Sequence, residues 1–406
     1  MQKLLKISQQ TLWQIIGKVV FSLATFIILA LIARNYGEEG TGVFTLALTY
    51  LAIFYLLSDF GFNAHVLRKV KRQNSKVKKE WQKLLGTRIL WSGVLIVLAI
   101  GLLPFWPFTT PEFAQAVVMG ALAIMVTGIF VTCNLIFQSS LRYDLSVLAS
   151  SLGTVVGLAV FGYLVLSKYP VPILLLAHFS GWLVITVVAV ILLRKMVRSL
   201  SPIFDIPYTI DLFKKSWPIA ATLTINVVYF RADSFLIAYF KSVSEAGVYN
   251  VAYSVFQSAL VLPTFIMNVY YPMMLKSFKG IKFVALGLLG LASFGTVITL
   301  LLSPFVVNIL TGGGFFGSAQ SLQILSLGFP AYFLSALLMW VLVTKSKYKT
   351  LLIIYLIGLL VNLSLNFIFI PQYSFMAASW ITVISEYLIL VMQTVVLLFE
   401  RSEDTS

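Results

Sequence analysis

"LIARNYGEEGTGVFTLA" (31–47) and "LIAYFKSVSEAGVYNVA" (236–252) are two versions of one segment, and their relationship decides the fold of this chain. The second version lies 205 positions after the first, about half of the 406-residue length. The identical residues, given by their positions in the first version, are Leu31, Ile32, Ala33, Gly42, Val43 and Ala47. Each version joins the end of one apolar run to the start of the next. A match at this offset indicates that the chain consists of two related halves.

Apolar runs long enough to cross a lipid bilayer recur along the whole chain. The sequence is 60% hydrophobic and only 11% charged, and a soluble protein cannot bury that much apolar surface. A helix needs about 20 apolar residues to cross the hydrocarbon core. The predicted spans are 11–33, 41–62, 84–108, 113–137, 145–167, 171–193, 216–240, 246–272, 283–310, 317–344, 350–371 and 375–398. The chain is therefore predicted to be a polytopic membrane protein.

The loops between these spans differ strongly in positive charge. One alternate set of loops, with both termini, holds 23 of the 29 Lys and Arg residues, whereas the other set holds three and the spans hold three. Because cytoplasmic loops are enriched in Lys and Arg, both termini are predicted to lie in the cytoplasm. The same bias accounts for the net charge of +15, so nucleic acid is not expected as a partner.

Six spans per half is an even number, so both halves cross the membrane in the same direction as parallel repeats. We predict an all-α integral membrane protein with twelve transmembrane helices in two parallel six-helix lobes, related by pseudo-two-fold symmetry around a central cavity. The N-terminal lobe is residues 1–200 and includes the basic cytoplasmic loop 63–83. A basic cytoplasmic linker, 201–215, joins it to the C-terminal lobe, 216–406. This is the architecture of a transporter.

Four stretches resemble the signature segments of Wzx-type polysaccharide flippases. "ARNYGEEGTGVFTLALTYLAIFYLLSDFGF" (33–62) is similar to their first-to-second helix segment, and "RADSFLIAYFKSVSEAGVYNVAYSV" (231–255) to their seventh-to-eighth. "LTGGGFFGSAQSLQILS" (310–326) and "VNLSLNFIFIPQYSFMAASWITVISE" (361–386) are similar to the ninth-to-tenth and eleventh-to-twelfth segments. The third to sixth spans are similar only in hydropathy. The family belongs to the multidrug/oligosaccharidyl-lipid/polysaccharide exporter superfamily.

The resemblance implies a flippase for polyprenyl-pyrophosphate-linked oligosaccharide repeat units, of the kind used for O-antigen or exopolysaccharide, which works by alternating access. It implies undecaprenyl-pyrophosphate-linked oligosaccharide and membrane lipids as partners, and leaves polysaccharide polymerase and assembly proteins open as further partners. It further implies a monomer in the cell inner (cytoplasmic) membrane without enzymatic activity or a cofactor. The single cysteine, Cys133, provides neither a disulfide nor a Cys-based metal site.

Charges inside the N-terminal spans are candidate site residues, because charge at bilayer depth is costly and faces a cavity or a partner. Lys18 continues a polar stripe along the first span, so we expect it to face the lumen. Asp59 and Arg88 lie about one turn from the cytoplasmic ends of their spans. Both reach the interface by snorkelling, or they guard the cytoplasmic mouth. Lys18 and Arg88 are predicted to bind an anionic substrate, and Asp59 to line the cavity or couple an ion.

Arg231 and Asp233 lie within the seventh span, two positions apart. They point about 200° from each other on a helix and cannot pair there. When the Lys18 stripe is shifted by 205 positions, it falls between Arg231 and Asp233 on the helical wheel. The two charges are therefore predicted to flank the corresponding lumen-facing side of the seventh span. Arg231 and Asn226 are predicted to bind the substrate head group. Asp233, on the polar stripe that includes Asn226, either organises the neighbours of Arg231 or couples an ion.

Glu386 lies in the middle of the twelfth span and shares its helical face with Ser379, Thr382 and Gln393. The sequence allows two roles for this carboxylate, one structural and one in proton coupling. It joins helices by hydrogen bonds, or it titrates near neutral pH and couples transport to protons.

Two other functions remain as alternatives to the flippase. A multidrug or cation antiporter of the same superfamily would use Asp233, Glu386 and Tyr229 around a cationic drug, but Lys18 and Arg231 would oppose it. A membrane glycosyltransferase, polymerase or ligase is less favoured, because the outward loops are short and hold few acidic residues.

Overall fold

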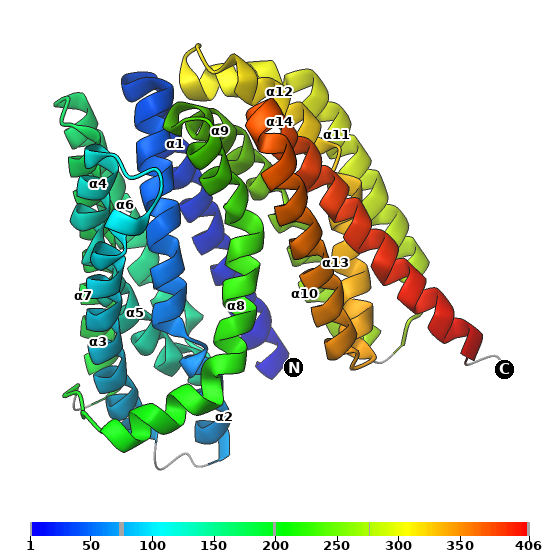
Figure 1. Cartoon of the computed structure of the whole chain (residues 1–406). Coiled ribbons are helices and arrows are strands. Elements are labelled where there is room, and N and C mark those ends of the chain that lie inside the picture. Colours follow the sequence, from blue (N-terminus) through cyan, green and yellow to red (C-terminus); the bar gives the residue numbers. More distant parts are fainter. Residues whose placement is uncertain (1, 73–76, 198–199, 276, 404–406) are drawn as a thin grey trace. The chain divides into compact units, whose positions relative to one another are not determined.

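A computed structural model describes residues 2–72, 77–197, 200–275 and 277–403, and this part of the chain is helical (Figure 1). A short 3-10 helix, Leu103–Phe105, follows α3. The α-helices in chain order are α1 (Gln2–Asp59), α2 (Phe62–Arg72), α3 (Val77–Gly101), α4 (Pro111–Ala121), α5 (Ala123–Ser139), α6 (Tyr143–Leu166), α7 (Val171–Arg194), α8 (Ile206–Phe240), α9 (Val243–Ala259), α10 (Val261–Met274), α11 (Ile281–Thr311), α12 (Phe316–Ser326), α13 (Phe329–Thr344) and α14 (Tyr348–Glu403).

The two longest helices, α1 and α14, are each broken once. Gly37 has φ 64° and ψ −162°, and Ser374 has φ 53° and ψ −139°, so the helical hydrogen bonds stop at both residues. The apolar stretches around the breaks contain 55 and 52 residues. A straight helix of that length would measure about 80 Å, against a hydrocarbon core of about 30 Å. Each long helix therefore supplies two crossings.

Eight helices of the described residues are long and apolar enough to cross a membrane, or nine if the bent pair α12 and α13 is one span. Two of them are the broken helices α1 and α14, which hold two predicted spans each. The predicted span 216–240 forms the second part of α8, which is not among these eight helices. Each of the twelve predicted spans therefore corresponds to a helix, to half of a broken helix, or to a pair of consecutive helices.

Proline explains two of the breaks within spans. The span 246–272 is interrupted between α9 and α10, because Pro263 has no N–H to bond to the Ala259 carbonyl and its ring crowds that position. The axes of α12 and α13 differ by 44°. Here Pro330 leaves the carbonyl of Ser326 without its helical donor, and Thr296 Oγ1 donates to it at 2.7 Å. Because Pro263 lies inside the predicted span 246–272, the sequence predicts a kink at the first break. The second break was not predicted.

The chain divides into two compact units. The first consists of Met1–Tyr36 and Val43–Val227, and the second of Gly37–Gly42 and Val228–Ser406. The change from the first unit to the second falls inside α8, between Val227 and Val228. The predicted lobe boundaries at residues 200 and 216 therefore stay a prediction.

Small residues allow close helix packing within each unit. In the first unit α6 and α7 meet at Gly157 and Gly181, where a Cβ on Gly157 would lie 3.0 Å from the Gly181 Cα. Such contacts are typical of helices packed in membranes. In the second unit the segment 37–42 lies against α9: a Cβ on Gly42 would lie 1.9 Å from the Val243 carbonyl oxygen. A Cβ on Gly247, the repeat partner of Gly42, would lie 2.3 Å from the Glu38 carbonyl oxygen.

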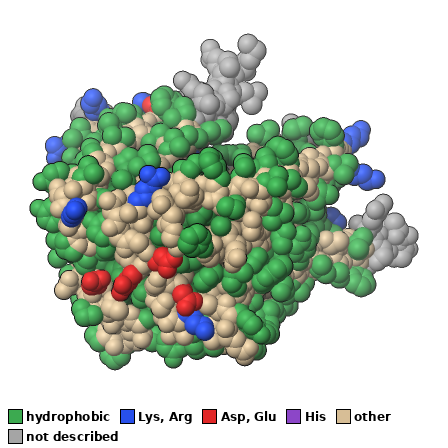
Figure 2. All heavy atoms as spheres, turned by 90° about the horizontal axis from the view of Figure 1, so that it is seen from above, with side chains coloured by type: hydrophobic (Ala, Val, Ile, Leu, Met, Phe, Trp, Pro, Cys, Tyr) green, Lys and Arg blue, Asp and Glu red, His purple; other side chains and the backbone are tan. Residues whose placement is uncertain are grey.

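Large hydrophobic side chains are exposed along the helices of both units. They include Val97, Leu166, Phe283, Leu301 and Phe399. Many hydrophobic side chains are also visible in the view from above (Figure 2). Lipid, rather than water, suits such a surface, because a soluble monomer rarely exposes large contiguous apolar patches.

Candidate functional site

A buried polar cluster in the second unit is built around Asp233 of α8, which is only 3% exposed. Asn366 Nδ2 donates to Asp233 Oδ1 at 2.7 Å, and the hydroxyls of Tyr249 and Thr382 donate to Oδ2 at 2.9 and 3.0 Å. These donors come from α9 and from both halves of α14. Three neutral donors satisfy the carboxylate, as a buried polar group requires.

One turn before Asp233 on α8, the Tyr229 hydroxyl donates to Glu386 Oε1 at 3.0 Å. Glu386 lies one turn after Thr382 on α14. Residues four apart share a helical face. The contacts Tyr229–Glu386 and Asp233–Thr382 therefore lie one turn apart between α8 and the second half of α14, which run antiparallel. Glu386 is 4% exposed and accepts from this one donor among the described hydrogen bonds.

The cluster extends along α14 through amides and hydroxyls. Asn366 Nδ2 also donates to Asn362 Oδ1 at 2.9 Å, and Asn362 Nδ2 donates to Ser385 Oγ at 3.1 Å. Within this cluster, Asn366 Oδ1 is buried without a hydrogen-bond partner among the described residues. Because such atoms are costly in an apolar interior, this part of the unit suits water or a bound ion.

Neither Asp233 nor Glu386 takes part in an ion pair with any described residue. An isolated buried carboxylate is strongly disfavoured, so it takes up a proton or attracts a cation. Asp233 has three donors that stabilise a charged carboxylate, whereas Glu386 has one. The two carboxylates therefore differ in how easily their protonation state changes.

Arg231 points to a different side of α8 and has separate partners, as the angle of about 200° predicts. Its guanidinium donates to Gln257 Oε1 at 3.2 Å and lies 5.9 Å from the centre of the Tyr253 ring. The side chain is half-buried, and the described residues form no ion pair with it. Arg231 therefore has neutral neighbours and can accept an anionic ligand.

Arg88 in the first unit is bound quite differently. Its Nη2 donates to Asp59 Oδ1 at 2.8 Å and to Asn63 Oδ1 at 3.1 Å, and its Nη1 donates to Thr132 Oγ1 at 3.2 Å. Arg88 is 0% exposed, whereas the Asp59 side chain is 36% exposed. The guanidinium is buried and does not snorkel to the interface, because acceptors on neighbouring helices hold it. The structure brings Arg88 and Asp59 together as a link between α1, α2, α3 and α5.

For the remaining predicted site residues, Lys18 and Asn226, the structure gives a position in a helix, which alone does not support a site role. Lys18 is exposed on α1 in the first unit. Asn226 lies within α8, but its side chain lies outside the described part of the structure. The site roles of both residues stay predictions, as does substrate binding by Arg88. No group of three His, Cys, Asp or Glu side chains that could hold a metal occurs among the described residues.

Several partners in these clusters were not singled out from the sequence. They are Asn63, Thr132, Ser234, Tyr249, Asn250, Gln257 and Ser385. Ser234 Oγ donates to Asn250 Oδ1 at 2.6 Å, next to the Tyr249–Asp233 contact. The one available signal was the repeat itself, because Tyr249 and Asn250 lie within its second version.

A family model described as "Polysaccharide biosynthesis protein" matches residues 7–278. A "Putative O-antigen transporter" of Shigella dysenteriae is 22% identical over 352 residues, which are 85% of this chain and 86% of that protein. The family match covers more than half of the chain.

Two solved structures show the same fold. "Lipid II flippase MurJ, inward closed conformation" has a TM-score of 0.74 at 12% identity and covers 96% of this chain and 87% of its own. The inward-facing conformation of a MATE-family multidrug resistance transporter has a TM-score of 0.71 at 11% identity and covers 94% of both chains. The predicted twelve-helix fold with two lobes is thereby confirmed, and so is the resemblance to flippases of this superfamily. These relatives are transporters, in agreement with the prediction that the chain is not an enzyme.

Proposed function

Because the chain belongs to the polysaccharide biosynthesis protein family, we propose that it is a flippase for polyprenyl-pyrophosphate-linked oligosaccharide repeat units. It moves them from the cytoplasmic to the outer leaflet for surface polysaccharide such as O-antigen. The similarity to the Shigella transporter over most of both chains supports this substrate class.

The surroundings of Arg231 are the observation that carries this proposal. A pyrophosphate needs a cation with free hydrogen-bonding capacity at membrane depth, and guanidinium groups bind phosphate oxygens in pairs. Arg231 contacts a neutral amide and an aromatic ring, whereas Arg88 is already neutralised by Asp59. Arg231 is therefore the stronger candidate for the head-group contact, with Lys18 and Asn226 as further predicted contacts.

Transport by alternating access would follow, with the sugars in a central cavity between the lobes and the lipid tail in the bilayer. Movement of the anionic head group outward is favoured by an inside-negative potential, by about 2.3 kcal/mol per charge for each 100 mV. An ion gradient is thus an additional driving force rather than a requirement.

Ion coupling, if it operates, involves the buried carboxylates of the second unit. Glu386 is the better candidate for a proton carrier, because a single hydrogen bond holds it, whereas three hydrogen bonds hold the Asp233 carboxyl in place. Asp233 suits a structural role or a cation site. Asp59 forms an ion pair with Arg88 that joins α1 to α3. Its role in the cavity or in ion coupling stays a prediction.

Depletion of the protein in its own cell, followed by analysis of the lipids, tests the proposed function. We expect undecaprenyl-linked repeat units to accumulate on the cytoplasmic side and surface polysaccharide to be lost. Complementation with Arg231→Gln should restore much less polysaccharide than complementation with Arg142→Gln, because Arg142 forms an exposed pair with Asp144. Normal surface polysaccharide after depletion would contradict the flippase.

A cation or multidrug antiporter is the second candidate, and one observation favours it. Two buried carboxylates that form no ion pair with a described residue lie near several tyrosines in the second unit, which is a suitable setting for an organic cation. Under this alternative, depletion leaves the polysaccharide unchanged and raises sensitivity to cationic drugs.

The location and partners belong to the same proposal. We place the protein in the cytoplasmic membrane with both termini in the cytoplasm, as the distribution of Lys and Arg predicts. A monomer would carry the substrate, and the polysaccharide polymerase or assembly proteins would receive it. Accessibility of terminal cysteine tags to an impermeant reagent tests the orientation.

A further inference from the structure

The first three turns of α8 differ in direction from the rest of this helix. Figure 1 shows that α8 begins with a segment that runs across the direction of α3 and α7 before the chain turns. Pro218 lies inside α8 and has no N–H for the Lys214 carbonyl, so a bend is expected next to it. We call residues 204–217 the linker segment. All of it belongs to the first unit.

One side of the linker segment is fixed to α3. The Ile203 N–H donates to the Gln82 carbonyl at 3.0 Å, and the hydroxyls of Thr87 and Thr209 are 2.8 Å apart. Lys83 Nζ lies 2.5 Å from Asp205 Oδ2. These contacts fix which face of the linker segment points toward α3.

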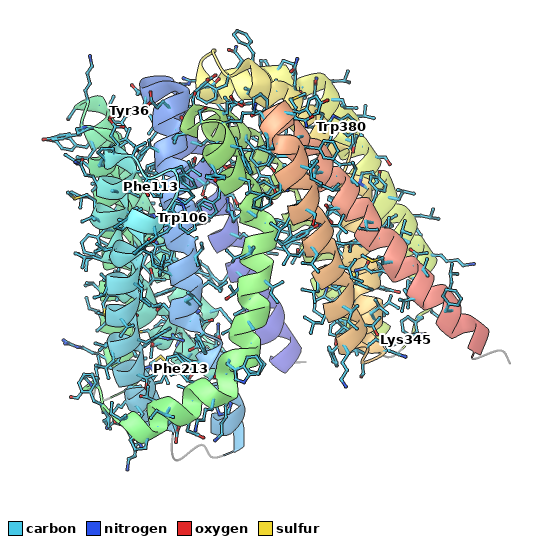
Figure 3. All side chains as sticks on the ribbon, in the orientation of Figure 1. Tyr36, Trp106, Phe113, Phe213, Lys345 and Trp380 are labelled. Atoms are coloured by element: carbon cyan, nitrogen blue, oxygen red, sulfur yellow. The ribbon has the colours of Figure 1, made fainter. Side chains whose placement is uncertain are left out.

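Apolar packing on the same side strengthens this attachment. Leu212 is buried, and the Phe213 ring packs edge-on against Phe60, Phe62 and Trp91 (Figure 3). The orientation of the segment is thus set by the protein itself.

A second side of the linker segment is apolar and exposed. Ile206, Ile210 and Trp217 lie within about 40° of each other on the helical wheel, and they are 58%, 50% and 60% exposed. Phe204, just before the helix, is also exposed. The described residues leave half or more of each of these four side chains uncovered, so this apolar surface needs an occupant from outside the chain.

The third side of the linker segment is charged and exposed. Asp211, Lys214 and Lys215 follow the apolar side around the helix, and Lys215 Nζ lies 2.6 Å from Asp211 Oδ2. Lys214 is next to the apolar stripe and has no carboxylate partner among the described ion pairs. A helix with one side against protein, one apolar and one charged is suited to the boundary between a bilayer and water.

We propose that the linker segment lies in the cytoplasmic headgroup region of the bilayer and binds phospholipid. Phe204, Ile206, Ile210 and Trp217 insert at the boundary with the acyl chains, and Lys214 contacts the anionic lipid phosphates. Tryptophan prefers this depth of the membrane, and a lysine beside an apolar stripe extends its ammonium to the phosphates. The linker would thereby be held by lipid as well as by α3.

Spin labels on the full-length protein in phospholipid nanodiscs test this placement. The background variant is Cys133→Ala, since Cys133 is buried. Labels at Ile210→Cys and Lys215→Cys are compared for collisions with oxygen, which is enriched in lipid, and with a water-soluble nickel chelate. We expect the label at residue 210 to be several-fold more accessible to oxygen than to nickel, and the label at residue 215 to show the opposite. Equal water accessibility at both positions would overturn the proposal, because no other partner is present.

Fluorescence quenching gives an independent measurement. Lipids brominated near the headgroup should quench Trp217, so the quenchable part of the emission falls in Trp217→Phe. The matched control is Trp81→Phe, which removes a buried tryptophan and should leave the quenchable part unchanged. Unchanged quenching in Trp217→Phe would show that the apolar side does not touch lipid.

Discussion

The Tyr229 hydroxyl donates a hydrogen bond of 3.0 Å to Glu386 Oε1, and one turn along the same two helices Thr382 donates to Asp233 at 3.0 Å. This register leaves the two buried carboxylates with different numbers of donors. Asp233 receives two further hydrogen bonds, from Tyr249 and Asn366. We therefore expect Asp233 to act mainly as a structural group and Glu386 to be the carboxyl that exchanges a proton.

Substitutions that remove the negative charge should therefore have different effects at the two positions. In Asp233→Asn an amide NH₂ takes the place of the oxygen that accepts from Tyr249 and Thr382, so both hydroxyls must turn and accept instead. We expect the free energy of unfolding to fall by about 1–3 kcal/mol. In Glu386→Gln the side-chain oxygen still accepts from Tyr229, so the loss should be smaller. Thermal unfolding in detergent compares the stability of the two variants, and Asp233→Asn should unfold at the lower temperature.

The same pair of variants also tests proton coupling. Glutamine cannot carry a proton, so transport by Glu386→Gln should no longer respond to a pH gradient across proteoliposomes. Wild-type protein assayed with the same labelled lipid-linked sugar is the reference. A gradient response that survives in Glu386→Gln would exclude this residue as the proton carrier.

The Arg88 cluster should contribute far more to stability than an exposed ion pair. Arg88→Ala leaves Asp59, Asn63 and Thr132 without their donor. Breaking a fully buried pair typically costs about 3–5 kcal/mol, and the partial exposure of Asp59 places the expected loss at or below the lower end of that range. Arg142→Ala removes an exposed pair with Asp144, for which about 0–1 kcal/mol is typical. Melting temperatures of the two variants provide the comparison, and equal values would argue against the buried cluster.

The close contact between segment 37–42 and α9 makes its glycines sensitive to substitution. A Cβ at Gly42 would lie 1.9 Å from the Val243 carbonyl oxygen, so Gly42→Ala must displace the backbone. We expect a clear loss of thermal stability for Gly42→Ala and for Gly247→Ala. Gly290→Ala is the control, since no atom lies within 4 Å of its Cβ position. Alanine favours a helix by about 1 kcal/mol over glycine, so this control should unfold at the same or a higher temperature.

Hydropathy predicts the spans well because the bilayer requires each crossing to be apolar and helical. It does not predict how a helix ends. The breaks at Gly37 and Ser374 occupy a single residue each, whereas the sequence suggested short loops there. The helical start of α8 at Ile206 was also missed, since residues 201–215 are too polar to be read as a span.

The candidate site was predictable only in part, for a related reason. Charges inside apolar runs are conspicuous, so Arg88, Arg231, Asp233 and Glu386 could be named from the sequence. Their partners depend on which helices touch and at what register. Tyr249 is one such partner, since nothing in its local sequence distinguishes it from an ordinary aromatic residue of a membrane helix.

The attachment of the linker to α3 should depend on pH in a defined direction. The hydrogen bond from Lys83, with that from the Tyr208 N–H, holds the pKa of the Asp205 carboxyl below its usual range. A lowered pKa means that this contact stabilises the attachment fully above the unfolded value of about 3.9 and is lost as the pH falls through the folded value. A spin label at Ser201→Cys should therefore be more mobile in Asp205→Asn than in wild type at pH 7. The difference should begin to shrink below about pH 4 and disappear once the pH is below the folded pKa of Asp205. A difference that persists in acid would assign the effect to packing rather than to the Lys83–Asp205 pair.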